Sequence, residues 1–123
     1  MELRTHKDLE VWKKAVELAT DLYVITAKFP KEEIYGLTLQ ARRSAVSVPS
    51  NIAEGAARNS KKEFLQHLYV ALGSVAELET QLILAQRIGF LRDASLDDRV
   101  DKVRRMLVGL IDFLKRKPVT RHA

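Results

Sequence analysis

Cysteine is absent from this chain of 123 residues, which excludes a disulfide framework, thiol catalysis and zinc sites built on cysteine. The five glycines are scattered singly, so no glycine-rich phosphate-binding loop is present. No apolar run approaches the ~18 residues of a membrane-spanning helix, and the polar N-terminus has no signal-peptide core. We therefore expect no membrane partner, and the lack of cysteine fits a reducing, cytoplasmic location.

The length suits one domain with one core, which we place at residues 1–117, followed by a short basic tail at 118–123. The net charge is +5, and residues 90–123 hold nine basic and five acidic groups, a surplus of +4. Such a segment attracts nucleic acid, acidic protein or anionic membrane. A solvated helix end is the alternative interpretation, because cations also complement the helix dipole.

Apolar residues recur at helical spacing in four segments. The first segment, which Thr5 caps with Asp8 three residues later and Phe29-Pro30 closes, carries two neighbouring apolar stripes. One stripe contains Leu9, Trp12, Val16, Ala19 and Tyr23, and the other contains Val11, Ala15, Leu18, Leu22 and Ile25. Two stripes are more than one helix–helix seam requires.

The second helix is predicted to begin near Lys31 or Glu32 and to contain Pro49. An interior proline removes one backbone hydrogen bond and crowds an earlier carbonyl, which costs about 3 kcal/mol. We expect the helix to continue through a kink at Pro49, while local rules also allow a break. Gly55 and the polar residues 58–60 mark the next turn. The inner positions are Ile34, Leu37, Ala41, Ala45, Val48 and Ile52.

Two further helices follow. Ser60 and Glu63 form a capping box before the third, and Gly89 suits its end. Ser95 is the expected N-cap of the fourth, which Pro118 ends. Their inner positions are Phe64, Leu68, Ala71, Val75, Leu78, Leu82 and Ala85, then Leu96, Val100, Val103, Leu107, Leu110 and Leu114. Together the four segments predict an all-α fold, an up-down-up-down antiparallel four-helix bundle.

Residues for catalysis or metal binding form no recognisable pattern. A di-iron bundle needs two Glu-x-x-His motifs, and none of His6, His67 and His122 has a glutamate three residues before it. No Gly-x-Ser-x-Gly nucleophile elbow occurs either. We therefore expect no enzyme activity, no cofactor, no metal site and no small-molecule substrate.

Arg42 and Arg43 lie in a stretch of low charge beside apolar positions. They are candidates for phosphate contacts. Alternatively, their stems pack on the core or on a subunit interface while their heads pair with glutamates such as Glu54, Glu77 and Glu79. We favour oligomer-interface or structural ion pairs for these five residues over an active site, because ion-pair networks resemble active sites.

The predicted nucleic-acid contacts lie in the last helix and the tail. No RNP, KH or zinc-knuckle signature occurs, so binding would rely on salt-sensitive phosphate contacts without base readout. The candidate residues are Arg104, Arg105, Lys115, Arg116, Lys117 and Arg121.

Four uncommon strings occur in a characteristic order: DLEVWKKA at 8–15, QARRSA at 40–45, SVPSNIAEG at 47–55 and GSVAELETQL at 73–82. They resemble the bacterial four helix bundle protein family, whose best-known members are encoded inside intervening sequences of 23S rRNA genes. The resemblance covers residues 6 to 91. It implies association with RNA, in connection with rRNA.

The same resemblance implies a ring-shaped homopentamer. In such a ring, one patch meets a different patch on the neighbour, and we expect the surplus stripe of the first helix and the block 42–55 at or near that contact. A more distant branch of the family assists reverse transcriptases of diversity-generating retroelements. The alternative function is therefore a protein-binding scaffold, or an accessory subunit of a nucleic-acid enzyme such as a reverse transcriptase, and the nucleic acid could then be RNA or DNA.

Overall fold

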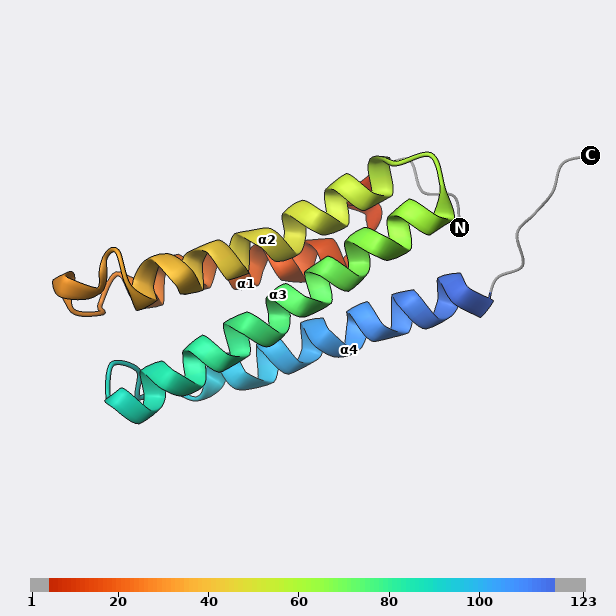
Figure 1. Cartoon of the computed structure of the whole chain (residues 1–123). Helices are drawn as coiled ribbons and strands as arrows, with labels where there is room; N and C mark the ends of the chain where they lie inside the picture. The colour runs from red at the N-terminus through yellow and green to blue at the C-terminus, as the bar shows by residue number, and fades with distance from the viewer. Residues whose placement is uncertain (1–4, 117–123) are drawn as a thin grey trace, which may run out of the picture.

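The computed structural model describes residues 5–116. Four helices, α1 (Glu10–Thr26), α2 (Leu37–Ala57), α3 (Lys61–Ile88) and α4 (Ser95–Arg116), run alternately up and down in an elongated bundle (Figure 1). Two short 3-10 turns, η1 (His6–Asp8) and η2 (Lys31–Glu33), precede α1 and α2. The predicted all-α, antiparallel four-helix bundle is confirmed.

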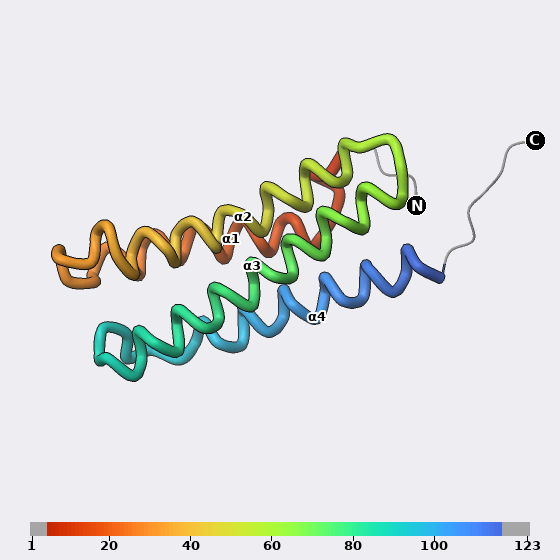
Figure 2. Tube along the Cα trace, in the orientation of Figure 1, coloured from red at the N-terminus to blue at the C-terminus, as the bar shows by residue number. Residues whose placement is uncertain are grey.

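Each helix packs against the helices that precede and follow it in the chain. α2 packs against α1 and α3, and α4 packs against α3 and completes the bundle on α1. Figure 2 shows the short connections between successive helices. Each connection reverses the direction of the chain, so the next helix runs back beside the one before it. The antiparallel order brings the start of α3 and the end of α4 to the same end of the bundle.

The core is built from the inner stripes that the sequence indicates. Leu18 and Leu22 of α1, Ile52 of α2 and Leu78 of α3 are at most 2% exposed, and each such side chain contributes about 1.5–3 kcal/mol by leaving water. In α4 the line of buried residues moves gradually around the helix, and near its end Ile111 is buried. The drift arises because an ideal helix has 3.6 rather than 3.5 residues per turn.

The two stripes of α1 have different environments. Val11, Ala15, Leu18 and Leu22 are buried in the core. Of the other stripe, Trp12 and Val16 are half-buried and Tyr23 is 45% exposed. Leu9 and Ala19 of this stripe are also buried, so only its Trp12, Val16 and Tyr23 positions remain as apolar surface on the first helix.

The starts of α1 and α2 differ from the predicted positions. Thr5 caps η1, with Asp8 completing its capping box, and α1 begins only at Glu10. At the end of this helix, α1 stops at Thr26, shortly before the predicted Phe29-Pro30.

The prediction that α2 begins at Lys31 or Glu32 is wrong. Residues 31–33 form η2, Gly36 has a non-helical backbone, and α2 begins at Leu37. The Glu33 carboxylate accepts a hydrogen bond from the Leu37 N–H at 3.0 Å, which satisfies one of the free donors of a helix start. As a result, Ile34 lies outside α2 and is 48% exposed rather than inward.

α2 is continuous through Pro49. The alternative of a break there is therefore wrong, and the kink angle stays a prediction. The side-chain amide of Asn51 donates to the Ser47 carbonyl at 2.9 Å within this stretch. Gly55 lies in the last turn of α2, not in the loop that follows.

The remaining caps are partly as expected. Ser60 caps α3 by accepting from the Glu63 N–H at 3.1 Å, and Gly89 ends α3 with φ at +95°, where glycine is favoured. Ser95 is the first residue of α4 rather than its N-cap, and Asp93, two residues earlier, bonds it. Its carboxylate accepts from the Ser95 N–H at 2.8 Å and from the Ser95 hydroxyl at 3.0 Å, and these bonds lower the Asp93 pKa.

Within residues 5–116, α3 is the one helix that is long and apolar enough to cross a membrane by length and composition. The core helix of a soluble bundle passes the same test. The inner stripe of α3 is buried against α2 and α4. Its outer face carries Val70, Ile83, Leu84 and Ile88, each 42–58% exposed.

Candidate nucleic-acid interface

Two of the predicted phosphate contacts lie in the middle of α4 and share one carboxylate. The Arg104 guanidinium pairs with Asp101 one turn earlier, and Arg105 Nε pairs with the other oxygen of Asp101 at 3.0 Å. Because surface ion pairs contribute only about 0–1 kcal/mol, a phosphate can displace either pairing. The carboxylate nevertheless halves the positive charge at this point of the helix.

The end of α4 is more openly cationic. The Lys115 ammonium donates to the Tyr69 hydroxyl of α3 at 3.4 Å, and Arg116 Nε donates to the Asp112 carbonyl at 3.4 Å. Both side chains are exposed. The other two predicted contacts, Lys117 and Arg121, lie outside the described residues.

The start of α3 brings two further cations to the same end. Lys61 and Lys62, with Leu65, Gln66 and Tyr69, line an open hollow of about 430 Å³. Because Tyr69 lines the hollow and also accepts from Lys115, it connects the two helix ends. We refer to the set Lys61, Lys62, Tyr69, Lys115 and Arg116 as the α3–α4 basic cluster.

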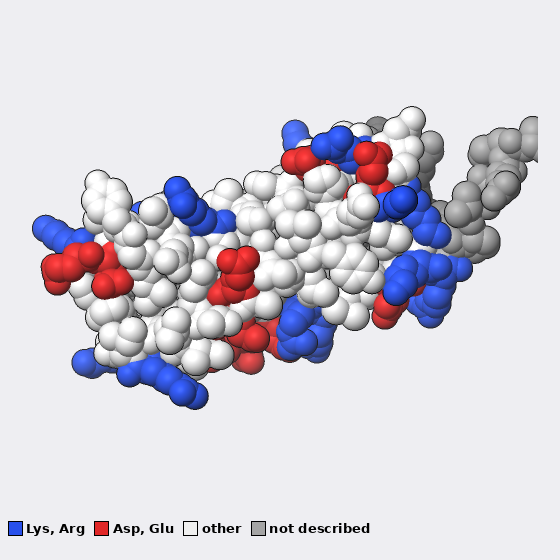
Figure 3. Space-filling view, in the orientation of Figure 1, with Lys and Arg blue, Asp and Glu red and all other residues white. Residues whose placement is uncertain are grey.

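The surface view supports this grouping. Lysine and arginine side chains gather at the end of the bundle where α3 begins and α4 ends (Figure 3), with a few acidic groups among them. One acidic neighbour is Glu63, whose carboxylate accepts from the Ser60 hydroxyl at 3.1 Å. Between the two ends, the same view shows mostly uncharged surface with acidic side chains near its middle.

Sequence reasoning missed Lys61, Lys62 and Tyr69. The charge of residues 60–89 sums to zero, so this segment gives no signal when charges are counted along the chain. The signal lies in the topology, since an up-down-up-down bundle must bring the start of the third helix to the end of the fourth.

Arg42 joins α1 to α2 without an ion pair. Its Nε donates to the Thr26 hydroxyl at 2.9 Å and a terminal nitrogen donates to the Tyr23 carbonyl at 3.4 Å. The guanidinium carbon also lies 4.5 Å from the centre of the Tyr23 ring, a cation–π contact. Two of the Arg42 donors and the face of its guanidinium are thus engaged inside the molecule, which makes Arg42 a bridge between α1 and α2.

Glu54 connects α2 to α3 through charged and polar partners. It pairs with Arg58 at 3.0 Å and lies 3.4 Å from His67 Nε2. The other ring nitrogen of His67 lies 3.2 Å from the Asn51 side-chain oxygen. Glu54 is therefore part of a structural network, one of the two roles predicted for it.

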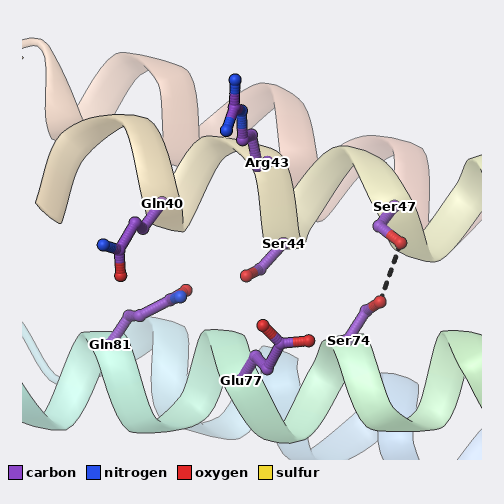
Figure 4. Close-up of a pocket in the computed structure, with 7 residues that line it drawn as sticks. All are labelled: Gln40, Arg43, Ser44, Ser47, Ser74, Glu77 and Gln81. Atoms are coloured by element: carbon purple, nitrogen blue, oxygen red, sulfur yellow. Dashed lines mark hydrogen bonds between the residues drawn. The ribbon is translucent and has the colours of Figure 1, made fainter. Parts of the chain in front are cut away.

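Arg43, Glu77 and Glu79 make no ion pair within residues 5–116. Arg43 and Glu77 instead line a hollow between α2 and α3 (Figure 4). In the same part of the chain, no group of three or more histidine and acidic residues could hold a metal ion.

Taken together, the fold and the cluster define a small helical-bundle protein with a cationic end. The model of the 23S rRNA-intervening sequence protein family matches residues 7–109, and the chain belongs to this family. No curated protein matches the chain.

Among solved structures, the chain is similar to a protein with unknown function from the S23 ribosomal protein family of Bacteroides thetaiotaomicron VPI-5482. The two chains are 23% identical, the alignment covers 83% of this chain and 95% of the other, and the TM-score is 0.76. At this level of identity the likeness confirms the fold alone.

Proposed function

We propose that this protein is a non-enzymatic, homo-oligomeric RNA-binding bundle that contacts phosphates through the α3–α4 basic cluster. The observation that carries the proposal is the meeting of Lys61, Lys62 and Lys115 around Tyr69, with Arg116 next in the chain, at one end of the bundle. Membership of a family named for intervening sequences of 23S rRNA supports RNA as the nucleic acid.

The cluster is suited to phosphate contacts rather than base readout. Lysine presents a flexible point charge, and such contacts give affinity without sequence preference. Tyr69, 48% exposed, supplies an aromatic face on which an unpaired base can stack. Structured RNA with a single-stranded loop or bulge is therefore the expected ligand class.

A homopentameric ring is the proposed assembly. Two different surfaces support it. Val16, Tyr23, Val24, Val46 and Pro49 line a shallow hollow of about 490 Å³ on α1 and α2, and the exposed side of α3 carries Val70, Ile83, Leu84 and Ile88 among charged residues. A closed ring requires two distinct, complementary patches on each copy. Repetition of the basic cluster around the ring would strengthen RNA binding through multivalency.

Binding of the purified protein to a structured RNA hairpin, at ~50 and ~200 mM salt, tests the proposal. We expect binding that weakens steeply with salt. The double variant Lys115→Ala/Arg116→Ala should bind at least tenfold more weakly, with a log–log salt slope smaller by about 2 for each engaged subunit.

The matched control is Lys28→Ala/Lys31→Ala, which removes the same charge from the opposite end of the bundle, between α1 and α2. Equal loss of affinity in both double variants would mean that net charge alone drives binding, and would overturn the assignment to the cluster. A DNA duplex of the same length measures the preference for RNA.

A protein-binding scaffold, or an accessory subunit of a nucleic-acid enzyme such as a reverse transcriptase, is the second candidate. The exposed apolar surfaces of α1–α2 and α3 favour it, since large exposed apolar patches usually mark interaction sites. The absence of RNA binding at low salt, combined with a defined stoichiometric complex with one purified partner enzyme, would favour this function over the first.

A further inference from the structure

A polar hollow of about 310 Å³ lies between α2 and α3, away from the basic cluster. Gln40 and Ser44 of α2 face Glu77 and Gln81 of α3 across it (Figure 4). Polar groups of this kind are uncommon on the seam between two helices of a bundle, where apolar side chains normally pack.

Among these residues, Gln81 gives the strongest indication of a ligand-binding site. Its side chain is nine-tenths buried, at 9% exposure, and its Oε1 has no hydrogen-bond partner among residues 5–116. Leaving a buried acceptor without a donor is destabilising. The hollow therefore contains an acceptor that a bound donor group would satisfy.

The inward-pointing charge of the hollow is negative. The Glu77 carboxylate points into it, whereas the Arg43 side chain projects away from α3 (Figure 4). No cation pairs with Glu77 inside the described chain. At one end of the hollow, the Ser47 and Ser74 hydroxyls bond each other at 2.8 Å. The acceptors left for a ligand are therefore the exposed Glu77 carboxylate and the buried Gln81 Oε1.

We propose that this hollow binds the guanidinium group of an arginine side chain presented by a protein, either a neighbouring copy of this chain or a different polypeptide. A guanidinium carries five donors in a planar fork and pairs with a carboxylate through two parallel bonds. Glu77 would take that fork, and Gln81 Oε1, one helical turn further along α3, would accept from a remaining N–H. The proposal is independent of RNA binding, since it uses no residue of the basic cluster.

A half-turn of the Gln81 side-chain amide exchanges its oxygen and nitrogen atoms. The net charge of the hollow is the same in both orientations. Turning the amide would place an N–H₂ beside Glu77 and leave the carboxylate as the only inward-pointing charge. An anion is thus disfavoured in both orientations. Water alone is the competing occupant, because a polar hollow of this size admits it.

Agmatine, a small guanidinium compound, is the probe. Its binding to the purified protein is followed through the ¹⁵N side-chain signals of Gln40 and Gln81. Where no neighbouring copy already fills the hollow, we expect saturable shifts of both signals, and at least a tenfold weaker affinity in Glu77→Gln, which preserves shape and removes charge. Asp98→Asn is the matched control, because Asp98 is exposed on α4 and does not line the hollow.

The source of the arginine is decided by the assembly state. If a neighbouring copy already supplies it, agmatine will not bind the assembled protein, and Glu77→Gln but not Asp98→Asn will weaken assembly in sedimentation experiments. If a different protein supplies it, agmatine will bind and assembly will be unaffected. No agmatine shift together with unchanged assembly in Glu77→Gln, or shifts of Gln81 by inorganic phosphate instead, would overturn the proposal.

Discussion

At the scale of single residues, Gly55 sets how closely α2 and α3 approach. A Cβ at this position would lie 2.6 Å from the His67 Cβ and 3.2 Å from the Phe64 carbonyl oxygen. Neither neighbour is the end of a flexible side chain, so relief would require the helices to separate. The close approach brings the network of Glu54, Asn51 and His67 within bonding range.

We expect Gly55→Ala to destabilise the bundle by about 1–3 kcal/mol, because overpacking outweighs the gain in helix propensity. Gly109→Ala is the matched control. Gly109 lies in α4, and a Cβ there meets nothing within 4 Å, so this substitution should stabilise by up to about 1 kcal/mol. Urea unfolding of both variants checks the pair, and equal effects of the same sign would contradict the close-approach argument.

At the scale of helices, the interiors and both ends of α3 could be predicted from the sequence, whereas the starts of α1 and α2 could not. Ser60 was identifiable as the cap of α3 because its partner Glu63 follows at the required spacing. The predicted start of α2 is wrong although residues 31–36 have helical periodicity. Residues 31–33 form a 3-10 turn and Gly36 has a non-helical backbone. Similarly, the sequence predicts a turn at Gly55, because the close packing that requires a glycine there depends on Phe64 and His67 of another helix.

The candidate interface was predictable only in part, for a similar reason. The cations at the end of α4 follow from charge counted along the chain. Their neighbours Lys61 and Lys62 join them only through tertiary packing. The unpartnered Gln81 had no sequence signal at all, since a glutamine on a helix is ordinarily exposed.

The start of α4 provides a pH-dependent prediction. The Ser95 N–H and hydroxyl donate to the Asp93 carboxylate and hold its pKa below the usual value near 3.8. A carboxyl whose pKa is lower when folded adds stability above its unfolded pKa, and that stability is lost as the pH falls through its folded pKa. Asp93 should therefore keep these hydrogen bonds to below pH 3.8.

An NMR titration of the Asp93 carboxyl carbon measures this pKa directly. In Ser95→Ala the hydroxyl bond is lost while the backbone bond remains, so the Asp93 pKa should rise but stay below its unfolded value. An unchanged pKa in Ser95→Ala would show that the hydroxyl does not contribute to the lowered pKa.

At the scale of the whole molecule, the apolar surface exceeds what four helices bury among themselves. Val24 of α1 is 62% exposed beside Tyr23, and the outer face of α3 adds a second patch on another side of the bundle. Two patches of this kind on one small protein suit repeated association in a ring better than a monomer.

We expect Val24→Asp to disrupt assembly, because a carboxylate in an apolar contact would be desolvated without a partner. If the protein is the proposed pentamer, sedimentation should then show a shift from about five times the 14.0 kDa chain mass towards that of one chain. Val108→Asp is the control, since Val108 is 40% exposed on α4 and belongs to neither patch. Retention of the wild-type mass by both variants would exclude the α1–α2 surface as the contact.

The short connections between the helices also affect the rate at which the bundle folds. Three residues separate α2 from α3 and six separate α3 from α4, so most packing joins segments that are close in sequence, and chains of this kind fold in about microseconds to milliseconds. The rate at which folded bundles associate with one another depends instead on protein concentration. At the low concentrations of early synthesis, the single bundle would therefore exist for a time as a free species with its apolar surfaces exposed.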